Sequence, residues 1–330
     1  MAVHYQARIL GTGRCLPSRV LTNHDLEGMV DTSDEWITQR TGIKERRLVE
    51  PGTPTSALAC EAARAALETA GIGPKDIGLI ILATITPDTI LPATACWVQE
   101  QLGAVNAGAI DVVAACSGFV YGLSFAANHV QADPEAKVLV IGAETLSYIT
   151  DYTDRASCIL FGDGAGAAVV GRSDDPERGL GPFELGSDGS GAEMMIQPAG
   201  GSRMPATHET IDNRLHYMKI RGREVYKFAV TKMVEMVSVA MERGGITTDQ
   251  LKLIIPHQVN IRILEGAAKR LQVPMDKIYV NIDRYGNTSA ASVPIALDEA
   301  AREGAILPGD AVVLVAFGGG LTWAACSMRW

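Results

Sequence analysis

The sequence has few aromatic residues, 5% of its 330 positions, and 34 glycines. We therefore expect a core built mainly from Ala, Val, Ile and Leu, with close backbone approaches at glycine. It also has no excess of positive charge: 29 Lys and Arg stand against 38 Asp and Glu, a net charge of −9. A general binder of nucleic acid needs the opposite sign, so we exclude that class. Any acidic partner must meet a local basic patch.

Paired cysteines are missing as well. The six cysteines form no CxxC pair and match no zinc-ligand spacing; they are Cys15, Cys60, Cys96, Cys116, Cys158 and Cys326. A chain of this length does not need disulfide bonds to hold its fold. We therefore expect reduced cysteines, no metal site and a cytoplasmic location.

Signals for export and membrane insertion are not found either. The first ten residues lack a basic segment followed by an apolar one, so we expect no signal peptide. The stretch 107–127 carries a single charge, Asp111, but several glycines and serines interrupt it. This composition favours a buried strand followed by a buried helix over a membrane span, and we expect no membrane insertion.

The chain repeats itself at an offset of 174 residues. Gly71-Ile72 and the run 76–81 align with Gly245-Ile246 and the run 250–255, and at the same offset 138–141 aligns with 312–315. Chance similarity of two amphipathic segments is the alternative, but one offset at two separate places argues against it.

Each half of the repeat predicts helices that alternate with strands apolar on both faces. The expected helices span 55–70, 117–131, 224–243 and 289–303. Such a pattern indicates helical layers packed over sheets. The predicted fold class is α/β, a duplicated α/β/α/β/α sandwich of five layers, with halves at 1–172 and 173–330. The polar stretch 171–215, rich in Gly and Pro, is expected to be an irregular insertion over the site.

Cys116 is the best candidate for a nucleophile. It lies where an apolar strand meets the helix 117–131, between small residues that leave room for a substrate. A thiol at a helix N-terminus faces unpaired N–H groups and the positive end of the dipole, which favour the thiolate and lower the thiol pKa. The alternative is a buried structural cysteine, the usual role of a lone cysteine.

Two residues of the second half could assist Cys116. His257 follows an apolar strand, at the edge where open α/β sheets collect their sites; alternatively, it is a strand-end histidine bonded to the backbone. Asn287 lies in the turn that mirrors the Cys116 turn; alternatively, this is a plain turn with Thr288 or Ser289 as N-cap. A neutral histidine and an asparagine supply two donors for an enolate oxygen, which suits decarboxylation and Claisen condensation better than hydrolysis.

Two glycine-rich segments and one basic helix complete the pattern. The segment 162–166 (GDGAG) is not a dinucleotide-binding motif, and we interpret it as tight packing near the junction of the halves. Gly319, in a run of three glycines, either presents an oxyanion donor to Cys116 or only turns the chain. Arg262, Lys269 and Arg270 share one face of the helix expected after His257, which is either a solvated face or a docking patch.

Seven short motifs run through the chain: 32–37 (TSDEWI), 40–43 (RTGI), 115–119 (ACSGF), 161–167 (FGDGAGA), 256–260 (PHQVN), 286–294 (GNTSAASVP) and 316–320 (AFGGG). Together they resemble β-ketoacyl-acyl-carrier-protein synthase III, the family that initiates bacterial type II fatty acid synthesis. The resemblance covers essentially the whole chain, and the combination is specific although each motif alone is weak. It implies the thiolase fold, in agreement with the repeat, and a homodimer.

The resemblance also implies a reaction. Cys116 would take the acyl group of acetyl-CoA or another acyl-CoA as a thioester, so that CoA is a substrate and no resident cofactor is expected. His257 and Asn287 would promote decarboxylation of malonyl-acyl-carrier protein (malonyl-ACP) and hold the enolate. The backbone N–H groups of Cys116 and Gly319 would form the oxyanion hole.

The two substrates would bind near the same edge. The adenine of CoA would lie against Trp36 and Arg155, with Arg40 and Asn260 at further CoA positions. The acyl carrier protein would contact Gln258, Val259, Asn260, Ile261 and Arg262, with Lys269 and Arg270 on the same helix.

Some positions depart from the family pattern. Ser117 and Val259 stand where alanine is common, and Leu91 stands where a phenylalanine often closes the acyl pocket from the partner subunit, so the length and branching of the primer stay open. Asn287 in place of a second histidine argues against an elongating synthase. The remaining alternatives are a family relative in secondary metabolism and, from another class, a cysteine-dependent thioester hydrolase.

Overall fold

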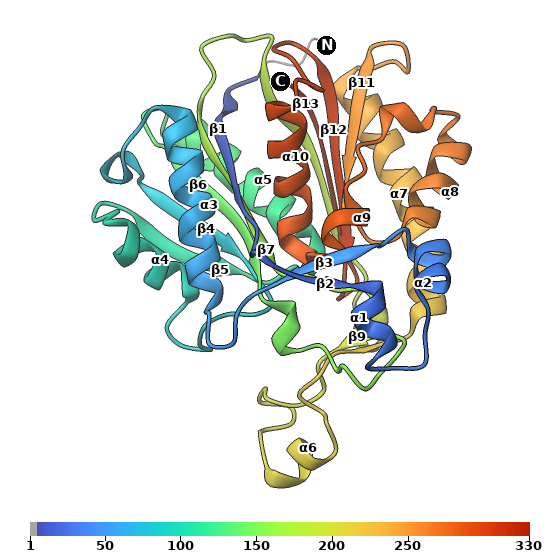
Figure 1. Cartoon of the computed structure of the whole chain (residues 1–330). Helices are drawn as coiled ribbons and strands as arrows, with labels where there is room; N and C mark the ends of the chain where they lie inside the picture. The colour runs from blue at the N-terminus through green and yellow to red at the C-terminus, as the bar shows by residue number, and fades with distance from the viewer. Residues whose placement is uncertain (1–4) are drawn as a thin grey trace.

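The computed structural model describes residues 5–330 and contains two mixed sheets with helices between them and on their outer faces (Figure 1). The first sheet has the strand order β1 (Ala7–Cys15), β7 (Gly164–Arg172), β6 (Val138–Glu144), β4 (Leu79–Ala83) and β5 (Gly108–Val112). The second has the order β11 (Leu251–Pro256), β12 (Ala311–Gly318), β13 (Thr322–Arg329) and β8 (Gly179–Ser187). Two short pairs join β2 (Arg19–Thr22) to β3 (Glu45–Leu48) and β9 (Met195–Ile196) to β10 (Lys219–Ile220).

The helices form three layers around these sheets. Their bounds are α1 (Asn23–Glu27), α2 (Asp34–Thr41), α3 (Thr55–Ala70), α4 (Thr94–Leu102), α5 (Gly118–Ala132), α6 (His208–Asp212), α7 (Gly222–Gly244), α8 (Ile261–Leu271), α9 (Ile282–Tyr285) and α10 (Ser292–Arg302). Single 3₁₀ turns are η1 (Pro74–Asp76), η2 (Ala115–Ser117), η3 (Leu146–Tyr148), η4 (Gly189–Met194), η5 (Met275–Lys277) and η6 (Ser289–Ala291).

Successive residues of the central strands alternate between two cores. Ile80 and Leu82 of β4 pack with α3 and α4 on the outer face of the first sheet, whereas Ile81 packs inward with α5 and α10. In the second sheet Val313 packs outward with α7 and α8, and Val312 packs inward. Strands buried on both faces need apolar residues at every position. The predicted five-layered α/β/α/β/α sandwich is therefore confirmed, and α3 spans the predicted 55–70.

The two halves of the repeat also share a strained backbone conformation at equivalent positions. Ala115 and Ser289, which are 174 residues apart, have φ values of +46° and +48°, a region that residues with a side chain rarely adopt. Each begins a 3₁₀ turn, η2 and η6, that leads into one of the two central helices. The two turns lie in contact, and strand β6 packs closely on the second of them, where a Cβ at Gly142 would collide with the Ala290 carbonyl group. The two halves therefore share one specialised turn, used twice.

The glycines of 162–166 provide the expected close packing at the junction of the halves. A Cβ on Gly166 would lie 2.7 Å from the Ile295 nitrogen and from Pro294 of α10, and one on Gly162 would collide with the Tyr285 carbonyl group. Glycine is required here because helix α10 of the second half lies directly on β7 of the first.

The prediction that 171–215 is irregular throughout is wrong. Residues 179–187 form β8, which pairs with β13 and places Leu180 in the inner core. Glycine and Pro182 hid the strand in the sequence; its position at the sheet edge tolerates them. Residues 173–178 and most of the segment after β9 are irregular, and the part around α6 projects from the body of the molecule (Figure 1). The stretch 107–127 forms β5 and the start of α5, and no helix among residues 5–330 has the length and apolarity to span a bilayer.

Candidate active site

Cys116 lies in the turn η2, between the edge strand β5 and the buried helix α5. The strained residue Ala115 reverses the chain, so that the thiol reaches the centre of the molecule, where Cys116 is 5% exposed. Strand β12 passes so close that a Cβ on Gly318 would lie 2.6 Å from the Cys116 nitrogen. The predicted strand-to-helix junction is confirmed, with the difference that Cys116 precedes α5 rather than opening it.

The expected lowering of the Cys116 pKa is wrong for this structure. The pKa of the thiol is raised to about 12, chiefly by burial and to a smaller degree by the Glu144 carboxyl, although Ser289 and the backbone N–H act to lower it. Loss of hydration disfavours the thiolate, and in this buried turn that cost outweighs the helix dipole. Cys116 is therefore a neutral thiol in the resting structure.

His257 directly follows β11 and is anchored to β12. Its backbone N–H donates to the Val315 carbonyl oxygen at 2.8 Å, and its ring lies edge-to-face with Phe317, with the ring centroids 5.8 Å apart. The ring is not held by the backbone, because Nδ1 is buried without a hydrogen-bond partner among residues 5–330. Burial lowers the His257 pKa to about 3. The imidazole is therefore neutral across the physiological pH range.

Asn287 is fixed by both its backbone and its side chain. The Asn287 N–H donates to the Leu160 carbonyl oxygen at 2.8 Å, and the Asn287 carbonyl oxygen accepts from the Gly162 N–H at 3.0 Å. Its Oδ1 accepts from the Ser289 N–H at 2.9 Å, which leaves the Nδ2 end free of hydrogen bonds to the described residues. Thr288 is the N-cap residue of η6, as the alternative proposed, although its side chain makes no capping hydrogen bond.

These three residues share structural supports. Strand β12 holds His257 through Val315 and abuts Cys116 through Gly318. Ser289, whose N–H binds Asn287, also lies close enough to Cys116 for its hydroxyl to lower the thiol pKa. The site therefore combines a buried thiol, a neutral imidazole and an amide held by its oxygen end.

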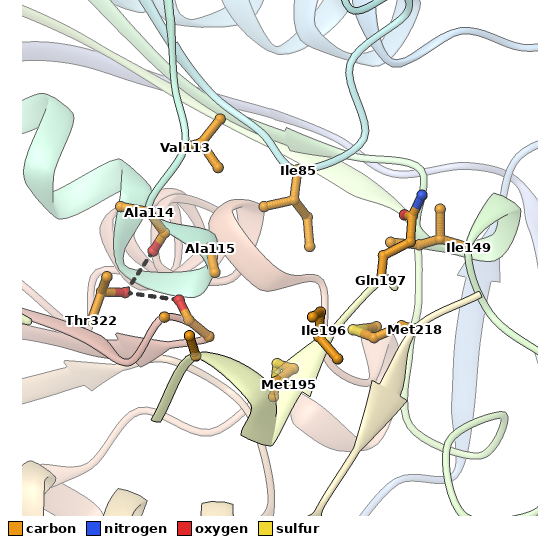
Figure 2. A pocket seen from close by; sticks show the side chains of 13 residues that line it. Ile85, Val113, Ala114, Ala115, Ile149, Met195, Ile196, Gln197, Met218 and Thr322 are labelled. Atoms are coloured by element: carbon orange, nitrogen blue, oxygen red, sulfur yellow. Dashed lines mark hydrogen bonds between the residues drawn. The ribbon is translucent and has the colours of Figure 1, made fainter. Parts of the chain in front are cut away.

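A cavity of about 360 Å³ is lined by Ala114 and Ala115, the two residues that precede Cys116 (Figure 2). Its floor includes Ala115 and Gly319, and Thr322 Oγ1 donates to the Ala114 carbonyl oxygen at 2.9 Å on the same side. Its walls are mostly apolar, with Ile85, Val113, Ile149, Met195 and Met218 pointing into it. The sequence analysis missed these wall residues, because they come from separate loops and no motif marks them.

Gly319 belongs to the turn between β12 and β13 and also lines this cavity, so the structure is compatible with both sequence interpretations. Leu91, predicted to close an acyl pocket, does not line the cavity of its own chain. It is 86% exposed at the tip of the loop after β4.

Trp36, which is partly buried, forms one cluster with the exposed Arg40 and Arg155. The guanidinium carbons of Arg40 and Arg155 lie 4.8 and 4.5 Å from the centroid of the Trp36 ring. Ser33 caps α2 by accepting from the Trp36 N–H, which fixes the position of the ring on the helix. Two cations over one indole provide a platform for a planar, negatively charged ligand. The predicted grouping of these three residues is therefore present.

The start of α8 abuts this cluster. Arg262 Nε donates to the Gln39 carbonyl oxygen of α2 at 2.9 Å, and Asn260 caps α8 by accepting from the Arg262 N–H at 2.9 Å. Arg262, Lys269 and Arg270 are exposed at the two ends of α8. Val259, Asn260 and Ile261 are partly exposed beside them. Positive charges therefore lie at both ends of α8, Arg262 next to the Trp36 cluster and Lys269 and Arg270 at the far end, with the exposed Glu265 between them.

Gln258 does not belong to that surface, which corrects its predicted contact with a carrier protein. Its side chain is 1% exposed. Its Nε2 donates to the carbonyl oxygens of Pro256 and Tyr279, each at 3.0 Å, and its Oε1 accepts from the Asn281 N–H. Gln258 holds the loop after β11 in place and cannot reach a docked protein.

Comparison with known proteins supports a single family. The family model "3-Oxoacyl-[acyl-carrier-protein (ACP)] synthase III" matches residues 110–189, and the model of its C-terminal part matches 241–330. A protein of Caldanaerobacter subterraneus subsp. tengcongensis, named beta-ketoacyl-[acyl-carrier-protein] synthase III, is 56% identical over 98% of both chains.

Solved structures are similar over the whole length. That of 3-oxoacyl-[acyl-carrier-protein] synthase III from Aquifex aeolicus is 46% identical, covers 98% of this chain and 100% of that one, and has a TM-score of 0.89. That of the priming β-ketosynthase from the R1128 polyketide pathway is 35% identical, covers 100% of this chain and 97% of that one, and has a TM-score of 0.91.

Proposed function

Because the chain belongs to the β-ketoacyl-acyl-carrier-protein synthase III family, we propose that Cys116, His257 and Asn287 carry out its condensation. The enzyme joins an acyl-CoA to malonyl-ACP and yields a 3-oxoacyl-ACP, CoA and CO₂. The observation that carries the residue assignment is that β12 supports both the buried thiol of Cys116 and the neutral imidazole of His257, while the Ser289 N–H orients the amide of Asn287.

In the first half-reaction Cys116 Sγ attacks the thioester carbonyl of the acyl-CoA. The new S–C bond forms, the bond to the CoA sulfur breaks, and the thiol proton ends on CoA. The N–H groups of Cys116 and Gly319 stabilise the oxyanion of the tetrahedral intermediate. The apolar cavity receives the acyl chain, and its walls support an apolar primer.

In the second half-reaction malonyl-ACP loses CO₂. The C–C bond electrons form an enolate, whose oxygen accepts hydrogen bonds from His257 and from Asn287 Nδ2. The enolate carbon then attacks the acyl-Cys116 carbonyl, and the Cys116 sulfur leaves and is protonated again. Neutral donors suit this step, because burial prevents His257 from taking up a proton itself.

The CoA nucleotide binds at the Trp36 cluster. The adenine lies against Trp36 and Arg155, and Arg40, which also lies over the Trp36 ring, supplies charge for the phosphates. Asn260 lies at the neighbouring start of α8 with its oxygen engaged by Arg262, so its amide nitrogen is the end that faces a ligand. CoA leaves as a product, and no resident cofactor takes part in either half-reaction.

The carrier protein docks on α8. Arg262 is the main contact, with Lys269, Arg270 and the partly exposed residues 259–261 around it. An acyl carrier protein is expected to be acidic, and this chain has a net charge of −9, so the two need a local patch of opposite sign. Arg262, at the start of α8, lies next to the residues proposed to hold CoA.

We expect Arg262→Glu to raise the KM for malonyl-ACP about tenfold or more and to change the KM for acetyl-CoA much less, because reversal of a docking charge turns attraction into repulsion. The Debye length at physiological salt is ~8 Å, so the effect is local and salt-dependent. Steady-state kinetics at low and high salt measure it. Arg64→Glu, on the exposed face of α3, is the matched control. A rise confined to acetyl-CoA would place the docking site elsewhere.

The protein functions as a homodimer joined through β5. This strand ends the first sheet, so one of its edges is unpaired, and Ile110 of β5 and Phe125 of α5 are exposed beside it. Val113, 76% exposed, lies on the same side and also lines the cavity. A second copy paired at this edge would cover these side chains, and the partner subunit's Leu91 would close the cavity near Val113.

We expect Ile110→Glu to convert the dimer to a monomer, because it places a charge in a paired, apolar edge. Light scattering coupled to size-exclusion chromatography gives the mass directly. Val105→Glu, in the exposed turn before β5, changes the same charge and should leave the dimer intact. A wild-type protein that runs as a monomer would overturn the proposal.

The alternatives are less well supported. A thioester hydrolase needs its histidine oriented by a third group, whereas His257 Nδ1 has no partner among residues 5–330. A role in secondary metabolism is not favoured, because the polyketide priming enzyme is less similar in sequence than the Aquifex aeolicus enzyme. The free cysteines agree with a cytoplasmic location.

The test of this function is acyl-enzyme formation followed by condensation. Incubation with acetyl-, branched- and medium-chain CoAs should add one acyl group to Cys116, detected by intact-mass and peptide mass spectrometry. Addition of malonyl-ACP should then yield 3-oxoacyl-ACP and CO₂. Release of free acid without malonyl-ACP would favour the hydrolase instead.

A further inference from the structure

Arg46, in β3, is a buried cation that the reaction above does not use. Its side chain is 0% exposed, although an arginine is rarely buried unless it is paired. Among residues 5–330 its hydrogen-bond partners are neutral oxygens: Nη1 donates to Asn23 Oδ1 at 2.7 Å, and Nε and Nη2 both donate to the Ile159 carbonyl oxygen, Nε at 3.2 Å. Burial lowers the pKa of Arg46 to about 10, so the guanidinium stays charged at neutral pH. These bonds must therefore compensate for the loss of hydration of a full charge.

The carbonyl group that Arg46 binds is the first of residues 159–162, which we call the clamp segment. The next carbonyl oxygen along the chain, that of Leu160, accepts from the Asn287 N–H at 2.8 Å. The Gly162 N–H in turn donates to the Asn287 carbonyl oxygen at 3.0 Å. The clamp segment therefore holds the backbone of Asn287 on both sides, and the guanidinium holds the clamp segment.

The aliphatic part of the Arg46 side chain packs against the same place. Strand β3 lies beside α9, the helix that leads into Asn287 (Figure 1). A Cβ on Gly286, directly before Asn287, would lie 3.1 Å from Arg46 Cγ, and one on Gly162 would lie 3.2 Å from Arg46 Cβ. Arg46 therefore contacts both of the chain segments that meet at Asn287.

The other partner of the guanidinium is itself firmly anchored. Asn23, which is 1% exposed, donates through Nδ2 to Asp34 Oδ1 of α2 at 2.8 Å and to the Ile43 carbonyl oxygen at 2.8 Å. Its Oδ1 is thereby fixed in the direction of Arg46. The guanidinium thus connects the clamp segment to α1 and α2 through two buried bonds.

The clamp segment keeps other attachments that do not involve the Arg46 side chain. Directly after it, the Asp163 N–H donates to the Arg47 carbonyl oxygen of β3 at 2.8 Å. The Asp163 carboxylate accepts from the Val49 N–H at 2.9 Å. Loss of the guanidinium should therefore shift Asn287 rather than release the segment from the fold.

We propose that Arg46 is a positioning residue for Asn287, which fixes the clamp segment so that Asn287 Nδ2 is directed at the enolate oxygen. This inference rests on the proposed role of Asn287 in decarboxylation. A hydrogen bond to a developing charge depends steeply on distance and angle, so the backbone that carries the amide must not move. A displacement of about 1 Å by a change far from the chemistry can lower a rate by about 10²-fold.

The experiment compares Arg46→Met with the wild type in the two half-reactions. Methionine keeps much of the apolar stem and removes the guanidinium. Release of CO₂ from saturating malonyl-ACP by pre-acylated enzyme should fall about 10–100-fold, with little change in KM. The burst of CoA at saturating acetyl-CoA should change little, because the backbone of Cys116 lies against β12. Equal losses in the two half-reactions, or no loss of CO₂ release, would overturn the proposal.

A double-mutant cycle separates this role from a general loosening of the fold. If Arg46 acts through Asn287, Arg46→Met should slow decarboxylation no further in a protein that already carries Asn287→Ala. Additive losses would mean that Arg46 acts by another route, and the proposal would be wrong. A wild-type rate in Asn287→Ala alone would instead overturn the proposed role of Asn287, and this inference with it.

Arg46→Lys covers the case in which Arg46→Met does not fold. Lysine keeps the charge but lacks the planar fork that binds Asn23 and the Ile159 carbonyl group together. Decarboxylation should therefore fall by an intermediate factor, and acylation should again be spared. Wild-type decarboxylation in Arg46→Lys would count against the proposal.

Arg178→Lys is the matched control. Arg178, directly before β8, also donates from Nε to a backbone carbonyl oxygen, that of Trp330, at 2.8 Å, but it does not line the cavity. This variant should leave both half-reactions unchanged. A loss of decarboxylation equal to that of Arg46→Lys would show that any such arginine has the same effect, which contradicts a specific role for Arg46.

Discussion

Cys116→Ala should abolish acyl transfer and condensation, with rates lower by about 10⁴-fold or more, while the protein stays folded. The sulfur is the atom that forms the acyl bond, and no other thiol lies in this turn. Alanine fits the space, so the cost in stability is small. Intact-mass spectrometry after incubation with acetyl-CoA measures the label, and a thermal melt monitors the fold.

The matched control for this variant is Cys326→Ala. Cys326 is buried in β13, and burial raises its pKa to about 12, as it does for Cys116. Its loss should leave the label on Cys116 intact, since it lies in the inner core away from the cavity. An acyl label on another cysteine of the Cys116→Ala variant would contradict the assignment of the nucleophile.

His257→Ala and Asn287→Ala should separate the two half-reactions. Each removes a donor aimed at the enolate oxygen, so decarboxylation of malonyl-ACP should slow by ~10²–10³-fold. Acyl-enzyme formation should fall much less, because the backbone N–H groups still serve Cys116. Release of CO₂ and the burst of CoA measure the two steps independently, and equal losses in both would contradict this division.

Two further measurements sharpen that test. Asn287→Asp is nearly isosteric but places a negative charge where the enolate develops, so it should slow decarboxylation more than Asn287→Ala does. The His257 pKa lies near 3 in the folded protein. The imidazole therefore stays neutral as the pH falls from 8 to 5, and protonation of His257 should produce no loss of decarboxylation in that range. A loss centred near pH 6.5 would mean that the ring is hydrated and titrates normally.

The sequence predicts the layers of this fold well because the signals are local. Helix α3 matches the prediction to the residue: Pro54 precedes it, and Gly71, with φ of +68°, ends it in the conformation that glycine favours. The alternation of helices with doubly buried strands and the repeat then suffice for the sandwich. Strand β8 is missed because Gly181 and Pro182 interrupt a short apolar pattern at a sheet edge.

The site likewise has features that the sequence predicts and features that it does not. Cys116, His257 and Asn287 lie in recognisable motifs next to predicted strand ends, so their positions follow from the chain. The pKa of Cys116 does not follow from the sequence, because the burial that raises it comes from residues far away in the chain, such as Gly318. Gln258 is assigned to the surface because its bond to Tyr279 is not visible in the sequence. Arg46 lies outside the motifs and becomes notable only when the loop before β7 closes on it.

The left-handed residues Ala115 and Ser289 also bear on how this protein can acquire heat resistance. Strain of this kind costs on the order of 1–3 kcal/mol at each residue, against a total folding stability of roughly 5–15 kcal/mol. Glycine would relieve the strain, but it would also give the unfolded chain more freedom, so the net gain is small. The turns at the reactive centre are therefore poor places to seek a higher melting temperature. Gains must come from the outer helices and surface loops, far from the chemistry.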